Sequence, residues 1–179
     1  MLREKLDALN ELAHGALPQK GEQAVATIKQ QEFAALDSAY QEFRSVVDEL
    51  DEKHFQEKWL DGRWGVREIV AHLTGWHREF AVGLERMGRG KRPAPEGSDW
   101  NAIQRWNDRF AAEAAGKGRA ELLQELDRSV AHFKAMGETL PEERFGDGKT
   151  ASVFFRNAGS EHFREHAAMI RTWLSKQSP

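Results

Sequence analysis

Apolar side chains recur at steps of three and four along most of this chain, which is the spacing of one buried face of an α-helix. The most regular run extends from Phe33 to Leu50. The same spacing predicts further helices over 66–87, 99–115, 122–136 and 152–175. Since no stretch alternates between apolar and polar residues for long, the sequence predicts an all-α protein without a sheet.

Two segments interrupt the helical pattern. The first, DEKHFQEKWLDGRWG at 51–65, mixes charges, glycines and aromatics without a period and is predicted to be a loop. The second, GRGKRPAPEGS at 88–98, is rich in Gly and Pro, and Ser98 or Asp99 then provides a helix N-cap. Four long amphipathic helices remain, with the 99–115 helix in a long connection. This arrangement predicts a four-helix bundle, a fold that builds its sites on inward helix faces.

The first 30 residues are set apart from the bundle. Leucines occupy positions 2, 6, 9 and 12 at helical spacing, and Gly15, Pro18 and Gly21 then end the pattern. We predict an extra N-terminal helical extension over 1–30, which packs on the bundle or on a second subunit. The bundle domain is then expected over 31–179.

Composition narrows the chemistry. The chain has 179 residues, the size of one domain, and its net charge of -3 gives no electrostatic argument for a nucleic-acid partner. The absence of Cys excludes disulfides and thiolate nucleophiles, so a bound metal would need nitrogen and oxygen ligands. Without a signal peptide or an apolar run of membrane-spanning length, we expect a soluble cytoplasmic protein.

The most informative motif is GSEHFREHAAMIRTWL, residues 159–174, in the last predicted helix. It places His162 and His166 four residues apart, so both imidazoles lie on one helix face. The same face continues through Ile170 and Trp173, which are typical core residues. The pair is therefore either an ordinary hydrogen-bonded pair or part of a metal site.

A third nitrogen ligand has to come from another helix. His72 is the candidate, because Ile69, Leu73 and Trp76 surround it at helical spacing, although a lone His on an apolar face is more often a satisfied core residue. His77 follows five residues later and points away from His72. Three imidazoles with an open position would suit Zn or Ni and a bound water of lowered pKa.

The tract WGVREIVAHLTGWHREF resembles the second-helix signature of the DinB superfamily, which includes mycothiol-dependent maleylpyruvate isomerases and bacillithiol-transferase-like proteins. The matching positions are Trp64, Val66, Arg67, Glu68 and His72-Leu73. The family's second motif, His-x-x-x-His in the last helix, corresponds to His162 and His166. The segment GSDWNAIQRWN is also similar to the DfsB and ClbS branch.

This resemblance covers the chain from about Phe33 to the C-terminus. It implies an up-down-down-up type of four-helix bundle and a divalent metal bound by His72, His162 and His166. It also implies a frequent homodimer. The reaction is not fixed by the resemblance.

Other residues are candidates for roles around the metal. Glu68, one turn before His72, would orient that imidazole or act as a base, with a salt bridge to Arg67 or Lys58 as the alternative. Trp100 and Trp106 would wall a substrate pocket, or simply pack. Arg105 would receive a substrate carboxylate, or lie on a solvated helix face.

The leading hypothesis is a metal-dependent enzyme that activates water or a small-molecule thiol, for hydrolysis or thiol transfer on a small organic electrophile. Because the chain has no Cys, a thiol would have to arrive as a cosubstrate. One rival is a non-enzymatic bundle that binds or sequesters a small molecule without metal. The other is a structural dimerisation bundle. We expect no nucleic-acid or membrane partner.

Overall fold

The structure is a computed structural model and describes residues 25–177. Within them the chain is helical and has no strand, apart from an isolated bridge between Leu60 and Trp64. The elements in chain order are α2 (Ile28–Asp48), α3 (Glu52–Gln56), α4 (Val66–Gly88), α5 (Ile103–Glu113), α6 (Arg119–Glu138), η1 (Glu142–Arg144), α7 (Thr150–Phe154), the π-helix η2 (Phe155–Ser160) and α8 (Glu161–Ser175). The predicted all-α class is confirmed.

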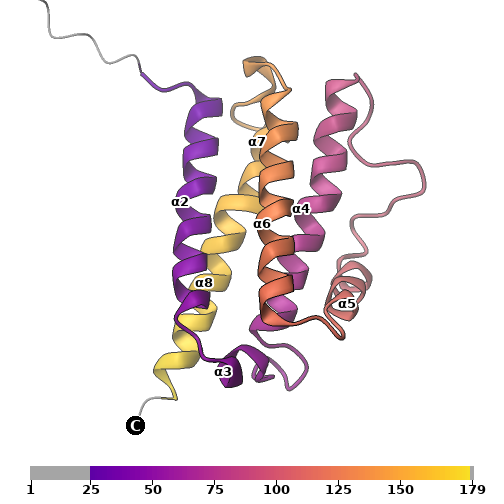
Figure 1. Cartoon of the computed structure of the whole chain (residues 1–179). Helices are drawn as coiled ribbons and strands as arrows, with labels where there is room; N and C mark the ends of the chain where they lie inside the picture. The colour runs from indigo at the N-terminus through magenta and orange to yellow at the C-terminus, as the bar shows by residue number, and fades with distance from the viewer. Residues whose placement is uncertain (1–24, 178–179) are drawn as a thin grey trace, which may run out of the picture.

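Four long helices form the bundle (Figure 1). The chain descends through α2, ascends through α4 and again through α6, and descends through α7, η2 and α8. α4 packs along α6, and α2 packs along η2 and α8. This is the up-down-down-up order that the resemblance implies. The predicted N-terminal helix lies largely outside the described residues, and α2 begins three residues before the predicted domain start at residue 31.

The connection between α4 and α6 makes these two neighbours parallel, because it carries the chain back along the whole bundle (Figure 1). Its helix α5 is shorter than predicted and starts at Ile103 with Ala102 as N-cap. The predicted cap at Ser98 or Asp99 is wrong: the Asp99 carboxylate accepts the backbone N–H of Asn101 at 3.0 Å within a turn. α5 approaches α4 closely at Gly75, because this residue has no side chain. A Cβ there would stand 2.2 Å from the Phe110 ring.

The segment 51–65, predicted as a loop, contains the short helix α3. Asp51 caps it by accepting the His54 backbone N–H at 2.8 Å. Five residues span little more than one helical turn, so α3 is too short to show a hydrophobic period. Its one buried side chain, Phe55, closes the end of the core.

The last helix begins at Thr150, two residues before the predicted cap Ser152. The Ser152 hydroxyl instead accepts the backbone N–H of Gly146 at 2.9 Å, which fixes the preceding turn. The π-type segment η2 then interrupts the α-helical ladder before α8.

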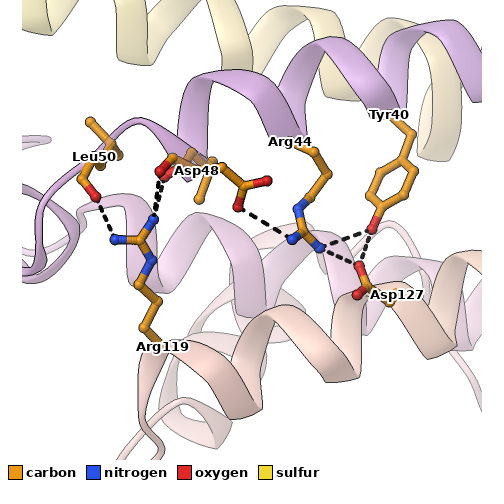
Figure 2. Close-up of polar contacts among 7 residues, drawn as sticks. Tyr40, Arg44, Asp48, Leu50, Arg119 and Asp127 are labelled. Atoms are coloured by element: carbon orange, nitrogen blue, oxygen red, sulfur yellow. Dashed lines mark hydrogen bonds and ion pairs between the residues drawn. The ribbon is translucent and has the colours of Figure 1, made fainter.

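A row of charged contacts joins the outer faces of α2 and α6 (Figure 2). The Arg44 guanidinium and the Tyr40 hydroxyl both donate to the Asp127 carboxylate, and Arg44 also reaches Asp48 at 3.2 Å. At the C-terminal end of α2, Arg119 donates to the carbonyls of Val47 and Leu50. We call Tyr40, Arg44 and Asp127 the α2–α6 seam.

Among the described residues, no helix combines the length and the apolar character that crossing a membrane requires.

Candidate metal centre

The structure brings the three predicted histidines together in the bundle interior. His72 comes from α4, and His162 and His166 come from α8. One nitrogen from each ring lies within 4.8 Å of the other two. The Nε2 atoms of His72 and His162 are 2.8 Å apart although 90 residues separate them. The His72 ring stands nearly perpendicular to both others, at 82°.

The surrounding helices place these rings for identifiable reasons. α4 is buried on almost every side along 66–77, which places the His72 ring in the bundle interior. On the other side, a π-type turn holds one residue more than an α-turn. η2 therefore rotates everything after it by about 100° relative to a continuous α-helix. That rotation sets which face of α8 meets α4.

Burial controls the charge of the cluster. It is the main cause that lowers the pKa of His72 to about 2, with His162 and His166 adding to the effect. Burial likewise lowers the pKa of His162 to about 4 and that of His166 to about 3. All three rings are therefore neutral at pH 7, which is the protonation state that binds metal ions.

The donor set fits a divalent ion that prefers nitrogen. Two nitrogens bound to one zinc ion at 2.0–2.1 Å in tetrahedral geometry lie about 3.4 Å apart. The 2.8 Å contact and the 4.8 Å limit stand on either side of that value. The Nδ1 atoms of all three histidines are buried without a hydrogen-bond partner among the described residues. Each of these three Nδ1 atoms is a buried polar atom without a compensating hydrogen bond from the described part of the chain, which is costly in a protein core.

Glu68 is not brought to this cluster. Its carboxylate accepts the backbone N–H of Gly65 at 2.9 Å, closing the N-terminus of α4, and lies 3.7 Å from the Lys58 ammonium. It also lines a different hollow, together with Lys58, Arg63 and Arg67. The salt bridge to Lys58 that the sequence left open as the alternative is thus present.

A hollow of about 400 Å³ opens beside the histidines. We call it the His72 hollow. Its lining residues are His72, Trp76, Phe80, Trp100, Asn101, Ile103, Asn157 and His162.

The three predicted substrate-binding residues do not share this hollow. Trp100 lines the His72 hollow. Arg105 and Trp106 line a separate hollow with Arg109, and the Trp106 indole N–H donates to the Asp99 carbonyl at 2.8 Å. Only Trp100 is therefore placed to touch a molecule bound beside the histidines.

Sequence reasoning missed His77. It is fully buried between Phe133 of α6 and Phe163 of α8, with its Nδ1 3.5 Å from the Ser129 hydroxyl. Burial lowers its pKa to about 3, and the Ala158 backbone in η2 acts in the opposite direction. It points away from His72, as predicted, but into the core rather than to the surface. The continuous apolar surroundings on α4 were the signal that could have located it.

Comparison with known families decides the relationship. The profile of the Mycothiol maleylpyruvate isomerase N-terminal domain matches residues 36–163. This chain belongs to that family. His72 and His162 lie within the matched segment, and His166 follows three residues after its end. The predicted kinship with the DinB superfamily is confirmed, and a search of curated protein sequences finds no match.

Solved structures of low identity share the fold of this family member. The Sibling Lethal Factor Precursor DfsB superposes with a TM-score of 0.70 at 21% identity, covering 86% of this chain and 98% of that chain. An uncharacterised protein from Escherichia coli UTI89 gives 0.71 at 17% identity, covering 86% and 96%. The colibactin self-resistance protein ClbS, solved in complex with a dsDNA, gives 0.71 at 17% identity, covering 85% and 98%.

The ClbS structure bears on the predicted absence of a nucleic-acid partner. ClbS was solved in complex with a double-stranded DNA, so the prediction of no nucleic-acid partner does not extend to every protein of this fold. At 17% identity the likeness shows the fold alone. For this chain the absence of a nucleic-acid partner stays a prediction.

Proposed function

We propose that this protein is a metal-dependent enzyme that acts on a small organic electrophile by hydrolysis or thiol transfer. The observation that carries the proposal is the convergence of three imidazoles from two helices, two of them buried and that of His162 partly buried, with nitrogens within 4.8 Å of one another. His72, His162 and His166 would hold the ion, with Zn or Ni as the metals that suit three nitrogen donors. Membership of a family named for a thiol-dependent isomerase supports the thiol branch.

The histidines and the aromatic side chains of the hollow would have different roles in the proposed reaction. A bound divalent ion would supply Lewis-acid activation of a water or thiol nucleophile at neutral pH. His72, His162 and His166 stay neutral and ready to bind, because burial lowers the pKa of each. The aromatic side chains of the His72 hollow would hold the electrophile and exclude water from it.

Glu68 is proposed as a positioning residue. It closes the first turn of α4 through the Gly65 backbone, one turn before His72. Fixing that turn fixes the direction in which the His72 ring leaves the helix. Its effect on the reaction would therefore pass through His72.

The alternative function is a bundle that binds a small molecule without metal. The 2.8 Å contact between His72 Nε2 and His162 Nε2 favours it, because a neutral N–H···N hydrogen bond satisfies both atoms without an ion. In this reading the same hollow binds the molecule, and no chemistry follows.

Metal analysis distinguishes the two functions. Protein purified without an affinity tag is expected to contain about one equivalent of Zn or Ni per chain, and His166→Ala is expected to weaken binding at least 100-fold. His132→Ala is the control, because His132 is exposed on α6. Metal-free protein that fails to take up either ion in a chelator competition would overturn the enzyme proposal in favour of the binder.

A screen with thiol cosubstrates separates the branches of the proposal. Turnover that requires both metal and a thiol supports transfer, whereas turnover with metal alone supports hydrolysis. We propose small-molecule partners over nucleic acid, supported by the net charge of -3, and a homodimer as the assembly state. A DNA mobility-shift assay and light scattering test these two expectations.

A further inference from the structure

We propose that the His72 hollow selects a flat, uncharged aromatic molecule whose polar groups are hydrogen-bonded by Asn101 and Asn157. This inference names the substrate class of the proposed enzyme and therefore rests on the proposed function. Four observations carry it: the aromatic walls, the exposed Ile103 at the rim, the absence of charged groups in the lining, and the amides of Asn101 and Asn157.

The walls of the hollow are aromatic on two sides. Trp76 and Phe80 lie one turn apart on α4 with their rings stacked at 5.4 Å and 23°. The Trp100 ring meets Phe80 edge-on, 5.1 Å away and inclined by 68°. These rings contact one another, so a flat aromatic molecule would stack on the exposed part of this aromatic surface rather than between the rings.

The rim of the hollow carries a large apolar side chain that is exposed to solvent. Ile103 opens α5 and is 57% exposed, one of four large apolar side chains so exposed among the described residues. It is the only one of those four that lines the His72 hollow. A molecule seated against Trp100 would cover it and gain from the apolar area removed from water.

The lining has no carboxylate, ammonium or guanidinium group. The cations predicted to receive a substrate carboxylate lie elsewhere, since Arg105 and Arg109 line a separate hollow. A charged molecule entering the His72 hollow would lose hydration without gaining an ion pair, which is a large cost. The part of the substrate that lies away from the metal is therefore uncharged.

The available polar groups suit neutral hydrogen-bonding partners. The amides of Asn101 and Asn157 each offer both donors and an acceptor, and η2 carries Asn157 to the hollow. A carbonyl, ether or amide oxygen on the ligand would accept hydrogen bonds from these two amides without bringing a charge.

A matched pair of probes tests the selectivity. We expect 2-naphthamide to bind at least about tenfold more tightly than 2-naphthoate, measured by calorimetry at pH 7.5. The full chain is used both as purified and after EDTA treatment, and the EDTA-treated protein decides because a carboxylate would otherwise bind an ion directly. Equal affinity, a preference for the naphthoate, or no binding of the naphthamide at millimolar concentration would each overturn the inference.

A variant with an added charge tests whether the probe binds in the His72 hollow. Asn101→Arg adds a cation at an exposed lining position and is expected to improve naphthoate binding at least about fivefold. Gln104→Arg adds the same charge at an exposed position of α5 that lines another hollow, and it should leave binding unchanged. An equal response of both variants would contradict the assignment.

The outcomes separate this inference from the proposed function. Zinc binding by the same protein is followed independently with a chromogenic chelator. Tight zinc binding without naphthamide selectivity would overturn the proposed substrate class and would still support the proposed metal site. Naphthamide selectivity without zinc binding keeps the aromatic hollow and removes the enzyme.

Discussion

Two polar clusters in this bundle differ in how their hydrogen bonds are satisfied. The histidine cluster lies between α4 and α8, is nearly dry, and leaves the Nδ1 atom of each ring without a partner among the described residues. The α2–α6 seam is half exposed, and its hydroxyl, guanidinium and carboxylate groups bond one another (Figure 2). The seam stabilises the fold through its own contacts, whereas the histidine cluster pairs His72 Nε2 with His162 Nε2 and leaves three Nδ1 atoms uncompensated by any described residue.

This difference helps to distinguish polar side chains that stabilise a helical bundle from polar side chains that are candidates for function. Buried polar groups in folded proteins normally have partners, so a group of three that lacks them requires an explanation. Functional sites are where a sequence departs from the rules that stabilise the rest of the fold. In the part of the chain that the structure describes, the seam leaves one buried atom without a partner, the Arg44 Nε, whereas the histidine cluster leaves the Nδ1 atom of every ring.

The largest expected contrast is in acid. The pKa values of His72, His77, His162 and His166 are lowered to between about 2 and about 4, whereas an unfolded His titrates near 6.5. Between these values the unfolded chain binds more protons than the folded one, so stability falls as pH falls below 6.5. From pH 7.5 to 5.5 each histidine is expected to cost about 1 kcal/mol.

Urea denaturation of EDTA-treated protein at a series of pH values measures this loss. His77→Leu should remove about a quarter of the pH dependence, and His132→Ala should change nothing, since His132 is exposed. A pH-independent stability between 7.5 and 5.5 would mean that the four rings are not held neutral by burial.

An intermediate effect of opposite sign is expected from one substitution in each cluster. In EDTA-treated protein, His166→Leu removes a buried unsatisfied group and should raise the free energy of unfolding by about 1–2 kcal/mol. Asp127→Ala removes the shared acceptor of Tyr40 and Arg44 and should lower it by about 1 kcal/mol. If both variants lose stability equally, the two clusters are alike in energy and the comparison fails.

The smallest effect is expected in alkali. Desolvation and the Asp127 carboxylate raise the pKa of Tyr40 to about 12, so the folded protein keeps the proton that an unfolded Tyr releases near 10. The stability linked to Tyr40 is therefore present below pH 10 and is lost as the pH rises toward 12. Tyr40→Phe should flatten this alkaline decline in thermal melts while leaving the acid limb unchanged.

The sequence predicted the long helices because each buries a continuous face. The run from Phe33 to Leu50 contains the buried side chains Leu36, Phe43 and Val47 at the expected spacing. Shorter elements escaped prediction for physical reasons. α3 has only five residues, and its start depends on the Asp51 side chain rather than on a periodic pattern.

The site was predictable as far as it depended on spacing within one helix. His162 and His166 share a face of α8 by the four-residue rule, and the apolar neighbours of His72 together with the family resemblance indicated the third histidine. The buried residues of α4 could not all be predicted from one apolar face, because this helix is covered on nearly all sides. His77 is buried on another side of it than His72. Arg105 is exposed on α5 and lines a hollow apart from the histidines, which agrees with the solvated-face alternative that the sequence left open.

The π-type turn η2 makes the chemistry of this bundle depend on residue count as much as on residue type. Deleting any one residue between Phe155 and Ser160 would restore an uninterrupted helix and swing His162 and His166 about 100° around its axis. All three histidines would still align, yet their rings would no longer lie together. Relatives one residue shorter in this stretch would keep the His-x-x-x-His motif and lose the cluster of three histidines.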